Sequence, residues 1–313
     1  MSSVDELMAL DKYQEAIVEM DKMIAMDSKS APLYYKKANI LQLMGKFEES
    51  IESYDDAIDI NPDHAPTLYN RGIAYEEIGL FRKAIKDYDR AIQIDPEMPL
   101  PYYNKALSLC HLNRHDEAID CYRAVVNIDS DDIDAYINMG SALRHLKRFE
   151  EALECYGRIQ EIDPMNTSAH YNMGNVYAET GRLIEAVKCF NIALLIDPNM
   201  QGAHYNKGLA LKSMGHIEMA IRCFDDCLLI NPLNTSALSN RTECLSELTK
   251  NDVAIEPNTE SEQQGIVSVK PPPIPTSLLK KSTAANDDIN NTVDSSQETG
   301  NIENKLSDER KNS

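Results

Sequence analysis

A period of 34 residues runs through most of the sequence. Five prolines mark it, in the stretches INPDH, IDPEM, IDPMN, IDPNM and INPLN: Pro62, Pro96, Pro164, Pro198 and Pro232. Ser130 stands where a sixth proline would fall. If each proline is repeat position 32, six full units follow one another, at 31–64, 65–98, 99–132, 133–166, 167–200 and 201–234. Such a chain can fold as an array in which each unit packs mainly against its neighbours.

Within each unit, three repeat positions predict two packed helices. Position 8 is always small: Ala38, Gly72, Ala106, Gly140, Gly174 and Gly208. Position 20 is small as well: Ser50, Ala84, Ala118, Ala152, Ala186 and Ala220. Position 24 carries a ring that fills the adjacent volume: Tyr54, Tyr88, Tyr122, Tyr156, Phe190 and Phe224. Small residues let helix axes approach closely, so we expect an antiparallel helix pair in every unit.

The sequence also indicates where these helices end. A residue suited to the left-handed conformation ends the first helix in five units: Gly45, Gly79, Asn113, Gly181 and Gly215. The proline at position 32 cannot continue the second helix. The pattern resembles the tetratricopeptide repeat (TPR), a 34-residue helix-turn-helix. The resemblance implies an all-α fold, an α-solenoid of stacked hairpins that forms a right-handed superhelix with a concave groove.

The resemblance divides the chain into four parts. Residues 1–30 are expected to form a truncated repeat, in which Ala16, Met20 and Met23 match the second helix, and 31–234 to form the six full units. Residues 235–250 are expected to form a capping helix, since a solenoid needs a polar end. Residues 251–313 are expected to be a disordered acidic tail with a proline-rich island, IVSVKPPPIPTSLLKK, at 266–281. That island is either a linear motif, a pseudo-ligand for the groove or a plain linker.

A column of asparagines occupies repeat position 6. After Lys36 it reads Asn70, Asn104, Asn138, Asn172, Asn206 and Asn240. On an ideal helix Asn172 lies about 200° from the core-facing Gly174, so the column is expected to line the groove together with Asn39 and Asn175 at position 9. An amide can both donate to and accept from a peptide main chain. We therefore predict that these eight asparagines bind peptide.

An alternative stays open for these residues. Each hydrogen bond contributes only about 0.5–1.5 kcal/mol, whereas association costs about 4–15 kcal/mol, so other anchors are needed. Position 5 offers a series of tyrosines that Ile137 interrupts: Tyr35, Tyr69, Tyr103, Tyr171 and Tyr205. These tyrosines could equally pack between repeats. The asparagines, in turn, could be polar residues that only set the spacing of helices.

Two family comparisons refine the predicted binding mode. The column resembles the one in the repeat domain of O-linked N-acetylglucosamine transferase, which implies binding of substrate main chain, although nothing here resembles the catalytic half of that enzyme. Co-chaperones that grip acidic chaperone termini use a lysine, asparagine and arginine clamp. Asn39 and Asn70 match its asparagines, but Tyr35 stands where a lysine belongs and Leu100 and Asn104 stand where cations belong. A carboxylate clamp is therefore not expected.

The net charge, the apolar runs and the cysteines limit which partners and which cellular location we expect for the protein. With 31 Lys and Arg against 51 Asp and Glu, the net charge of −20 argues against nucleic acid or an anionic membrane as partner, and either attracts basic partners or only aids solubility. The apolar runs are too short for a membrane span or signal peptide, which predicts a cytoplasmic protein. Four cysteines at position 23 are expected to be reduced thiols: Cys121, Cys155, Cys189 and Cys223.

No catalytic, cofactor or metal motif stands out. Cys223 and Cys227 lie one helical turn apart, but no second pair completes a metal site. His111 and His145, both at position 13, are expected to stack along the groove. The favoured function is a non-enzymatic scaffold that binds extended or helical peptide segments. The alternatives are an accessory subunit that delivers substrates to a separate catalytic protein, and an architectural component that self-associates through its first repeat.

Overall fold

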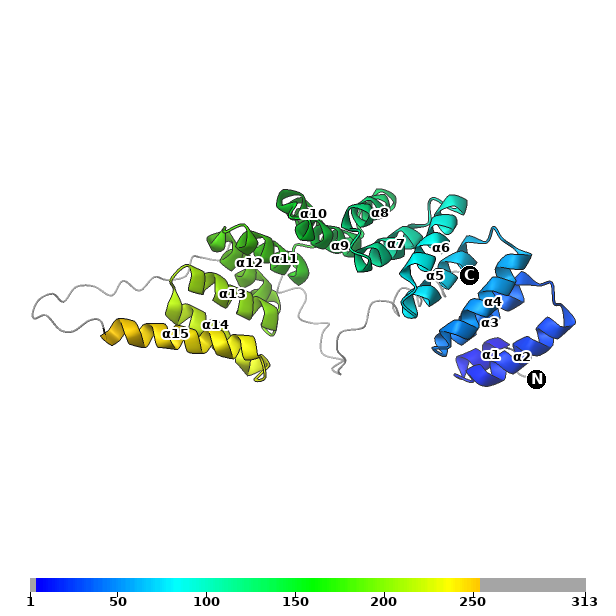
Figure 1. Cartoon of the computed structure of the whole chain (residues 1–313), viewed down its shortest axis with the longest axis horizontal. Helices are drawn as coiled ribbons and strands as arrows, with labels where there is room; N and C mark the ends of the chain where they lie inside the picture. The colour runs from blue at the N-terminus through cyan, green and yellow to red at the C-terminus, as the bar shows by residue number, and fades with distance from the viewer. Residues whose placement is uncertain (1–3, 254–313) are drawn as a thin grey trace, which may run out of the picture. The chain divides into compact units, whose positions relative to one another are not determined.

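The computed structural model describes residues 4–253, which form fifteen α-helices and no β-strand (Figure 1). The first helices of the six units are α3 (Ala31–Leu43), α5 (Ala65–Glu77), α7 (Pro99–His111), α9 (Ile133–His145), α11 (Thr167–Glu179) and α13 (Gln201–Ser213). The second helices are α4 (Phe47–Ile60), α6 (Phe81–Ile94), α8 (His115–Ile128), α10 (Phe149–Ile162), α12 (Leu183–Ile196) and α14 (Ile217–Ile230). The remaining helices are α1 (Val4–Ala9), α2 (Tyr13–Met26) and α15 (Thr235–Val253).

These helices pack in the order of the sequence. Each first helix packs against the second helix of its own unit, which packs against the first helix of the next unit. First helices of neighbouring units also touch one another, as in α3 and α5 or α11 and α13. The fold is therefore the α-solenoid of stacked antiparallel hairpins that the sequence predicts. First helices lie side by side, so residues at one repeat position form a row across them.

The helices at the two ends differ from the others. The first helix α1 has six residues, against 13 in each of the six units, and α15 continues to Val253 without a partner helix of its own unit among the described residues. The expected tail lies outside the described residues, apart from 251–253 at the end of α15. The proline-rich island at 266–281 lies outside them entirely.

The core of each hairpin is a ring set against a small residue. All six rings at position 24 are buried, with at most 1% of their surface exposed. A Cβ atom added at Gly174 would stand 2.5 Å from Cε1 of Phe190, and one added at Gly140 would stand 2.6 Å from Cε1 of Tyr156. Separations of this size are well inside van der Waals contact, so in these two units glycine is what fits against the ring as it is placed.

In the six full units, the turns follow the sequence with one addition. Gly45, Gly79, Gly181 and Gly215 have φ between 71° and 78°, and Asn113 has φ 56°. Lys147 takes the same left-handed conformation in the fourth unit, with φ 59°, although its side chain gives no signal for it. The turn is preserved there because the flanking helices fix it: the backbone N–H of Arg148 still donates to the carbonyl of Leu143.

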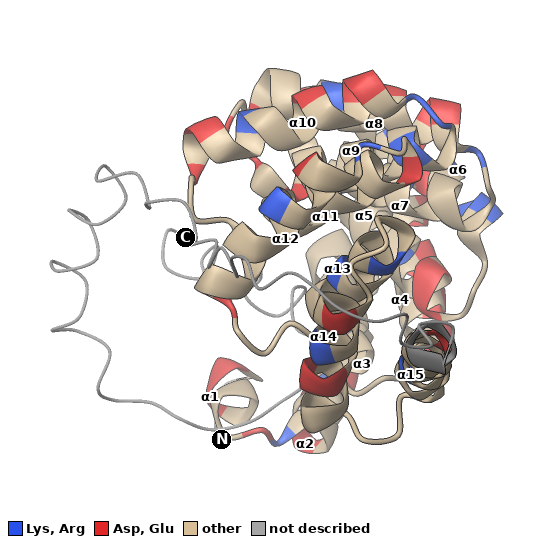
Figure 2. Ribbon diagram, turned by 90° about the vertical axis from the view of Figure 1, so that its left-hand side faces the viewer, with Lys and Arg blue, Asp and Glu red and all other residues tan. Residues whose placement is uncertain are grey.

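Ion pairs join several first helices to the second helix of the preceding unit. They link a cation at position 7 to an aspartate at position 25: Lys37 to Asp21, Arg71 to Asp55, Lys105 to Asp89, and Arg241 to Asp225. Arg71 also binds the buried Asp87 of its own unit through two hydrogen bonds of 2.7 Å. On the second helices α6, α8 and α10, acidic and basic residues are interspersed (Figure 2).

Candidate functional site

The asparagine column lies on the row of first helices. Its six members stand on α5, α7, α9, α11, α13 and α15, and all six side chains are half-buried. Each is therefore accessible from the side of the array that the first helices form. The structure brings these residues together as a row, one per repeat.

Most asparagines of the column are tied to a tyrosine of the preceding repeat. The side-chain Nδ2 donates to a tyrosine hydroxyl 35 residues earlier, at 2.8–3.3 Å, in five pairs: Asn70 to Tyr35, Asn104 to Tyr69, Asn138 to Tyr103, Asn206 to Tyr171, and Asn240 to Tyr205. The same tyrosine rings lie against the position-24 rings, with centroids 5.8–6.2 Å apart. Each tyrosine ring therefore packs against the core ring of its own repeat, and its hydroxyl reaches the next repeat and holds the column in place.

The asparagines at position 9 stand behind the column. Asn39 Oδ1 accepts hydrogen bonds from Asn70 at 3.1 Å and from the hydroxyl of Tyr54 at 2.6 Å. Asn175 Oδ1 accepts from Asn206 at 2.7 Å, and only 7% of Asn175 is exposed. This burial is greater than its place on the groove stripe suggests, because Asn206 of the next repeat covers it. Both residues orient a neighbouring asparagine.

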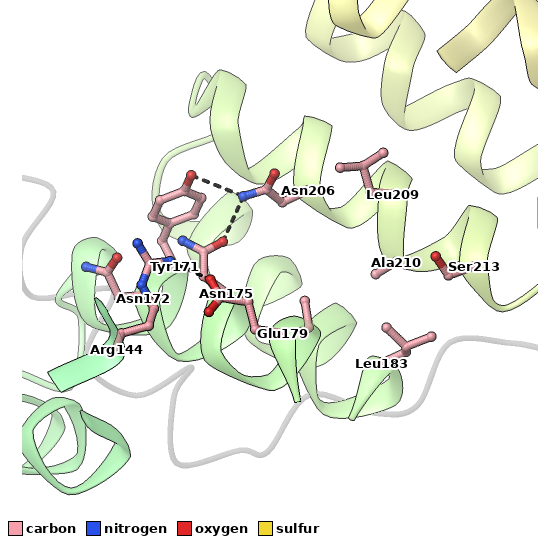
Figure 3. A pocket seen from close by; sticks show the side chains of 11 residues that line it. Arg144, Tyr171, Asn172, Asn175, Glu179, Leu183, Asn206, Leu209, Ala210 and Ser213 are labelled. Atoms are coloured by element: carbon pink, nitrogen blue, oxygen red, sulfur yellow. Dashed lines mark hydrogen bonds and ion pairs between the residues drawn. The ribbon is translucent and has the colours of Figure 1, made fainter. Parts of the chain in front are cut away.

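Asn172 differs from the rest of the column. The preceding repeat carries Ile137 at position 5, whose side chain has no acceptor. No described residue forms a hydrogen bond with the Asn172 side chain. In Figure 3, dashed lines join Tyr171, Asn175 and Asn206, while Asn172 stands apart from them near Arg144. Its whole amide is therefore available to a ligand.

A cavity of about 420 Å³ opens beside Asn172, between the fourth, fifth and sixth units. Its polar wall includes Arg144, Asn172, Asn175, Glu179 and Asn206 (Figure 3). Its aliphatic wall includes Ala178, Leu183, Leu209 and Ala210. About half of the lining is polar, so the cavity offers a ligand hydrogen-bonding groups next to aliphatic side chains.

Charged side chains at position 12 also reach this surface, and the sequence reasoning missed them. Arg144 forms an ion pair of 3.1 Å with Glu179, and Lys212 contacts Glu243 at 2.6 Å and Asn240 Oδ1 at 3.0 Å. The signal available in the sequence was a cation at position 12 followed by an acid at position 13 or 9 of the next unit. Each pair is locally neutral, so it adds no net charge to the groove.

Glu76, on α5, also stands at repeat position 12, but its side chain is acidic where Arg144 and Lys212 are basic. It accepts hydrogen bonds from the hydroxyls of Tyr88, at 2.6 Å, and Ser108. Burial raises the pKa of its carboxyl above the usual value, while these two hydrogen bonds act in the opposite direction. Glu76 therefore binds Tyr88 of its own repeat and Ser108 of the next.

The histidines at position 13 do not stack on one another. His111 stacks on Phe81, with ring centroids 4.6 Å apart, and His145 stacks on His115 at 5.2 Å. The expectation that His111 and His145 stack along the groove is therefore wrong. Each ring finds an aromatic neighbour at the start of a second helix, which is closer than the equivalent ring one repeat away.

The cysteines are free, and six of the seven are buried. Burial raises the pKa of the thiols of Cys121 and Cys189 to about 11 and that of Cys155 to about 12. Within residues 4–253, no group of three or more His, Cys, Asp or Glu side chains is placed to hold a metal ion. In the same part of the chain, no helix has the length and apolar character that a bilayer span requires.

Comparison with known families bears directly on the repeat. Models of the tetratricopeptide repeat match residues 65–98 and 167–200 and residues 202–232, and a TPR repeat model matches 38–79, 106–144 and 140–181. Together they span more than half of the chain. The chain belongs to the tetratricopeptide repeat family. TPR proteins are in general protein-interaction scaffolds that bind protein partners, and this statement holds for the family as a whole.

Solved TPR structures share the fold. YrrB, described as a TPR protein with an unusual peptide-binding site, is 24% identical over 61% of this chain and 99% of its own, with a TM-score of 0.52. The C-terminal part of a TPR repeat-containing protein from Cytophaga hutchinsonii is 15% identical over 76% and 97%, with a TM-score of 0.66. A chain of the APC/C hetero-tetramer Cut9–Hcn1 is 14% identical over 77% and 48%, with a TM-score of 0.52. No curated protein matched the sequence.

Proposed function

We propose that this TPR protein is a non-enzymatic scaffold that binds extended or helical peptide segments of partner proteins along the asparagine column, and that it does so in the cytoplasm. Its partners are proteins, not nucleic acid or membrane, since the net charge is −20. The name of YrrB mentions a peptide-binding site in a protein of the same fold, which supports this class of function.

One observation carries the proposal: in four members of the column the side-chain carbonyl stays unpaired among the described residues while the side-chain N–H groups are bound. No described donor reaches Oδ1 of Asn70, Asn104, Asn138 or Asn206, although Nδ2 of each donates to a tyrosine. The tyrosines therefore hold a row of acceptors, one per repeat, that backbone N–H groups of a peptide can fill. Neighbouring helices lie about 8–10 Å apart, which is close to three residues of extended chain.

The aliphatic wall of the cavity supplies the anchor that the hydrogen bonds lack. Leu209 and Leu183 face the same space as Asn206 and Asn172 (Figure 3). Burying one aliphatic side chain of a peptide there contributes about 1.5–3 kcal/mol, more than a single main-chain hydrogen bond. Affinity then comes from the cavity and alignment from the column.

The test is selection of binders from a random 12-residue peptide library on the full chain, followed by affinity measurements on two variants. Leu209→Arg places a charge in the cavity, whereas Leu195→Arg changes a residue of α12 that is 63% exposed and does not line it. We expect Leu209→Arg to weaken binding at least ten-fold and Leu195→Arg to leave it within two-fold. Equal affinities for both variants and the wild type would contradict the proposal.

A further inference from the structure

The asparagine column is not uniform in how its amide donors are used. Nδ2 carries two N–H groups. Asn70, Asn206 and Asn240 each direct Nδ2 at two acceptors, and Asn104 and Asn138 donate it to the tyrosine of the preceding repeat. Asn172 directs it at none among the described residues. The number of free donors therefore reaches its maximum at the fifth repeat.

The cause is a single residue of the fourth repeat. In the other five neighbouring pairs, position 5 is a tyrosine whose hydroxyl meets the next asparagine, but before Asn172 it is Ile137. The fold has room for a tyrosine at this place, since the equivalent Tyr103 packs edge-on against Tyr122, at a centroid distance of 5.8 Å. The isoleucine thus leaves one amide unpaired without disturbing the repeat.

An unpaired amide restricts which ligands can cover it. In the free protein Asn172 is half-buried, so water can satisfy its groups. A ligand that covers this residue displaces that water and must supply both an acceptor and a donor, because a buried polar group left unpaired weakens binding. The main chain of one extended residue presents both a carbonyl and an N–H. A proline or an N-methylated residue lacks the N–H and is disfavoured at this place.

The surroundings of Asn172 indicate which side chain the peptide should carry beyond the residue that Asn172 binds. A segment that follows the column passes from Asn172 on α11 to Asn206 on α13, about 8–10 Å further. Extended chain covers this distance in about three residues. The walls there are aliphatic, since Ala178, Leu183 and Leu209 line the cavity, and the nearest charges, Arg144 and Glu179, form an ion pair. A neutral aliphatic side chain is the one that fits.

We propose that Asn172 sets the register of the bound segment: its amide pairs with both the N–H and the carbonyl of one peptide residue, and an aliphatic side chain two or three residues along enters the space between Ala178, Leu183 and Leu209. The inference rests on the proposed peptide-binding function and adds a ligand class to it. Ile137 acts indirectly, because it leaves the amide of Asn172 unpaired.

The test restores the missing tyrosine. Ile137→Tyr supplies a hydroxyl for Asn172, as in the other five pairs, and Ile137→Phe adds the same ring without the hydroxyl. With a peptide selected from the 12-residue library, we expect Ile137→Tyr to bind about ten-fold more weakly than Ile137→Phe, which corresponds to about 1.4 kcal/mol. The melting temperature of Ile137→Tyr should be equal to or above that of Ile137→Phe. Equal affinities of the two variants would overturn the inference.

An N-methyl scan of the same peptide identifies the peptide residue whose backbone N–H binds Asn172. In the wild type, methylation of one backbone nitrogen should cost about ten-fold in affinity. In Asn172→Ala that penalty should disappear, whereas in Asn104→Ala it should persist. A penalty that persists in Asn172→Ala would overturn the inference even if both variants bind.

The two proposals fail in different ways. Peptide binding that is lost in Leu209→Arg but is equal in Ile137→Tyr and Ile137→Phe contradicts only the role of Asn172. Binding that is insensitive to Leu209→Arg contradicts the scaffold proposal itself.

Discussion

The hydroxyl of Tyr171 accepts a hydrogen bond of 3.2 Å from Nδ2 of Asn206, 35 residues further along the chain and in the next repeat. The same bond recurs in four more neighbouring pairs, so it belongs to the repeat unit as much as the helices do. It gives the asparagine column a structural role beside any role in binding. Tests that remove these asparagines must therefore follow stability as well as affinity.

The hydrogen bond between Asn138 and Tyr103 should stabilise the array measurably. Tyr103 is the only described partner of the Asn138 side chain, at 2.8 Å. Tyr103→Phe should lower the free energy of unfolding by about 1 kcal/mol, measured by urea denaturation, because a half-buried donor loses its acceptor. Tyr102→Phe, one residue earlier, removes a hydroxyl with no described partner and should change it by less than about 0.5 kcal/mol. Equal changes in the free energy of unfolding for Tyr103→Phe and Tyr102→Phe would contradict a specific contribution of the hydrogen bond between Asn138 and Tyr103.

Two glycine substitutions should have opposite effects on stability. Gly174→Ala brings a Cβ to 2.5 Å from the ring of Phe190, whereas a Cβ at Gly157, inside α10, meets nothing within 4 Å. Gly174→Ala should therefore destabilise the protein by about 1–3 kcal/mol through overpacking. Gly157→Ala should stabilise it by about 0.5–1 kcal/mol through helix propensity. Thermal unfolding of both variants checks the pair, and a stabilised Gly174→Ala would show that the ring can move aside.

Glu76→Gln should change how stability depends on pH. Burial raises the pKa of Glu76 in the folded state, so the folded chain binds this proton more tightly than the unfolded chain does. The contribution of Glu76 to stability therefore falls as the pH rises from its ordinary pKa of 4.5 through the raised value. Glutamine keeps an acceptor for Tyr88 and cannot ionise.

The difference in unfolding free energy between Glu76→Gln and the wild type should thus increase between pH 4.5 and pH 7, as measured by denaturant titrations at several pH values. Glu52→Gln, at an exposed position of α4, provides the control. A difference between Glu76→Gln and the wild type that is constant with pH would show that the carboxyl of Glu76 titrates alike in both states.

The buried thiols should react slowly in the folded protein. Because burial raises the pKa of Cys121 and Cys189 to about 11 and that of Cys155 to about 12, little of the reactive thiolate exists at pH 8. Alkylation with iodoacetamide, followed by mass spectrometry, should modify these three cysteines at least ten-fold more slowly in the native protein than in guanidinium. Similar rates in both conditions would mean that the second helices open readily.

The helices and their pairing could be read from the sequence because they depend on local chemistry. The small residue at position 8, the ring at position 24, the turn glycine and the proline each restrict the backbone or the packing within one unit. The exception among the six full units was Lys147, which adopts φ 59° and is neither glycine nor asparagine. There the helices on both sides impose a conformation that the residue itself does not favour.

The sequence also placed the asparagine column on the side opposite the hairpin core, because helical periodicity fixes direction. It could not assign the partners of the column, since each hydrogen bond joins atoms of residues 35 apart and depends on how far neighbouring repeats are rotated and shifted. For the same reason the stacking of His111 on Phe81 and the ion pair of Arg144 with Glu179 were not anticipated.

By itself, then, the sequence determined the repeat, its two helices and the direction in which each side chain leaves its helix, because these follow from backbone geometry within one unit. Only the tertiary structure decided that Asn206 is held by Tyr171 while Asn172, whose preceding repeat carries Ile137 at the same position, has no such partner among the described residues. That distinction depends on the stacking of one repeat against the next, which brings an acceptor within hydrogen-bond distance of one amide and not of the other.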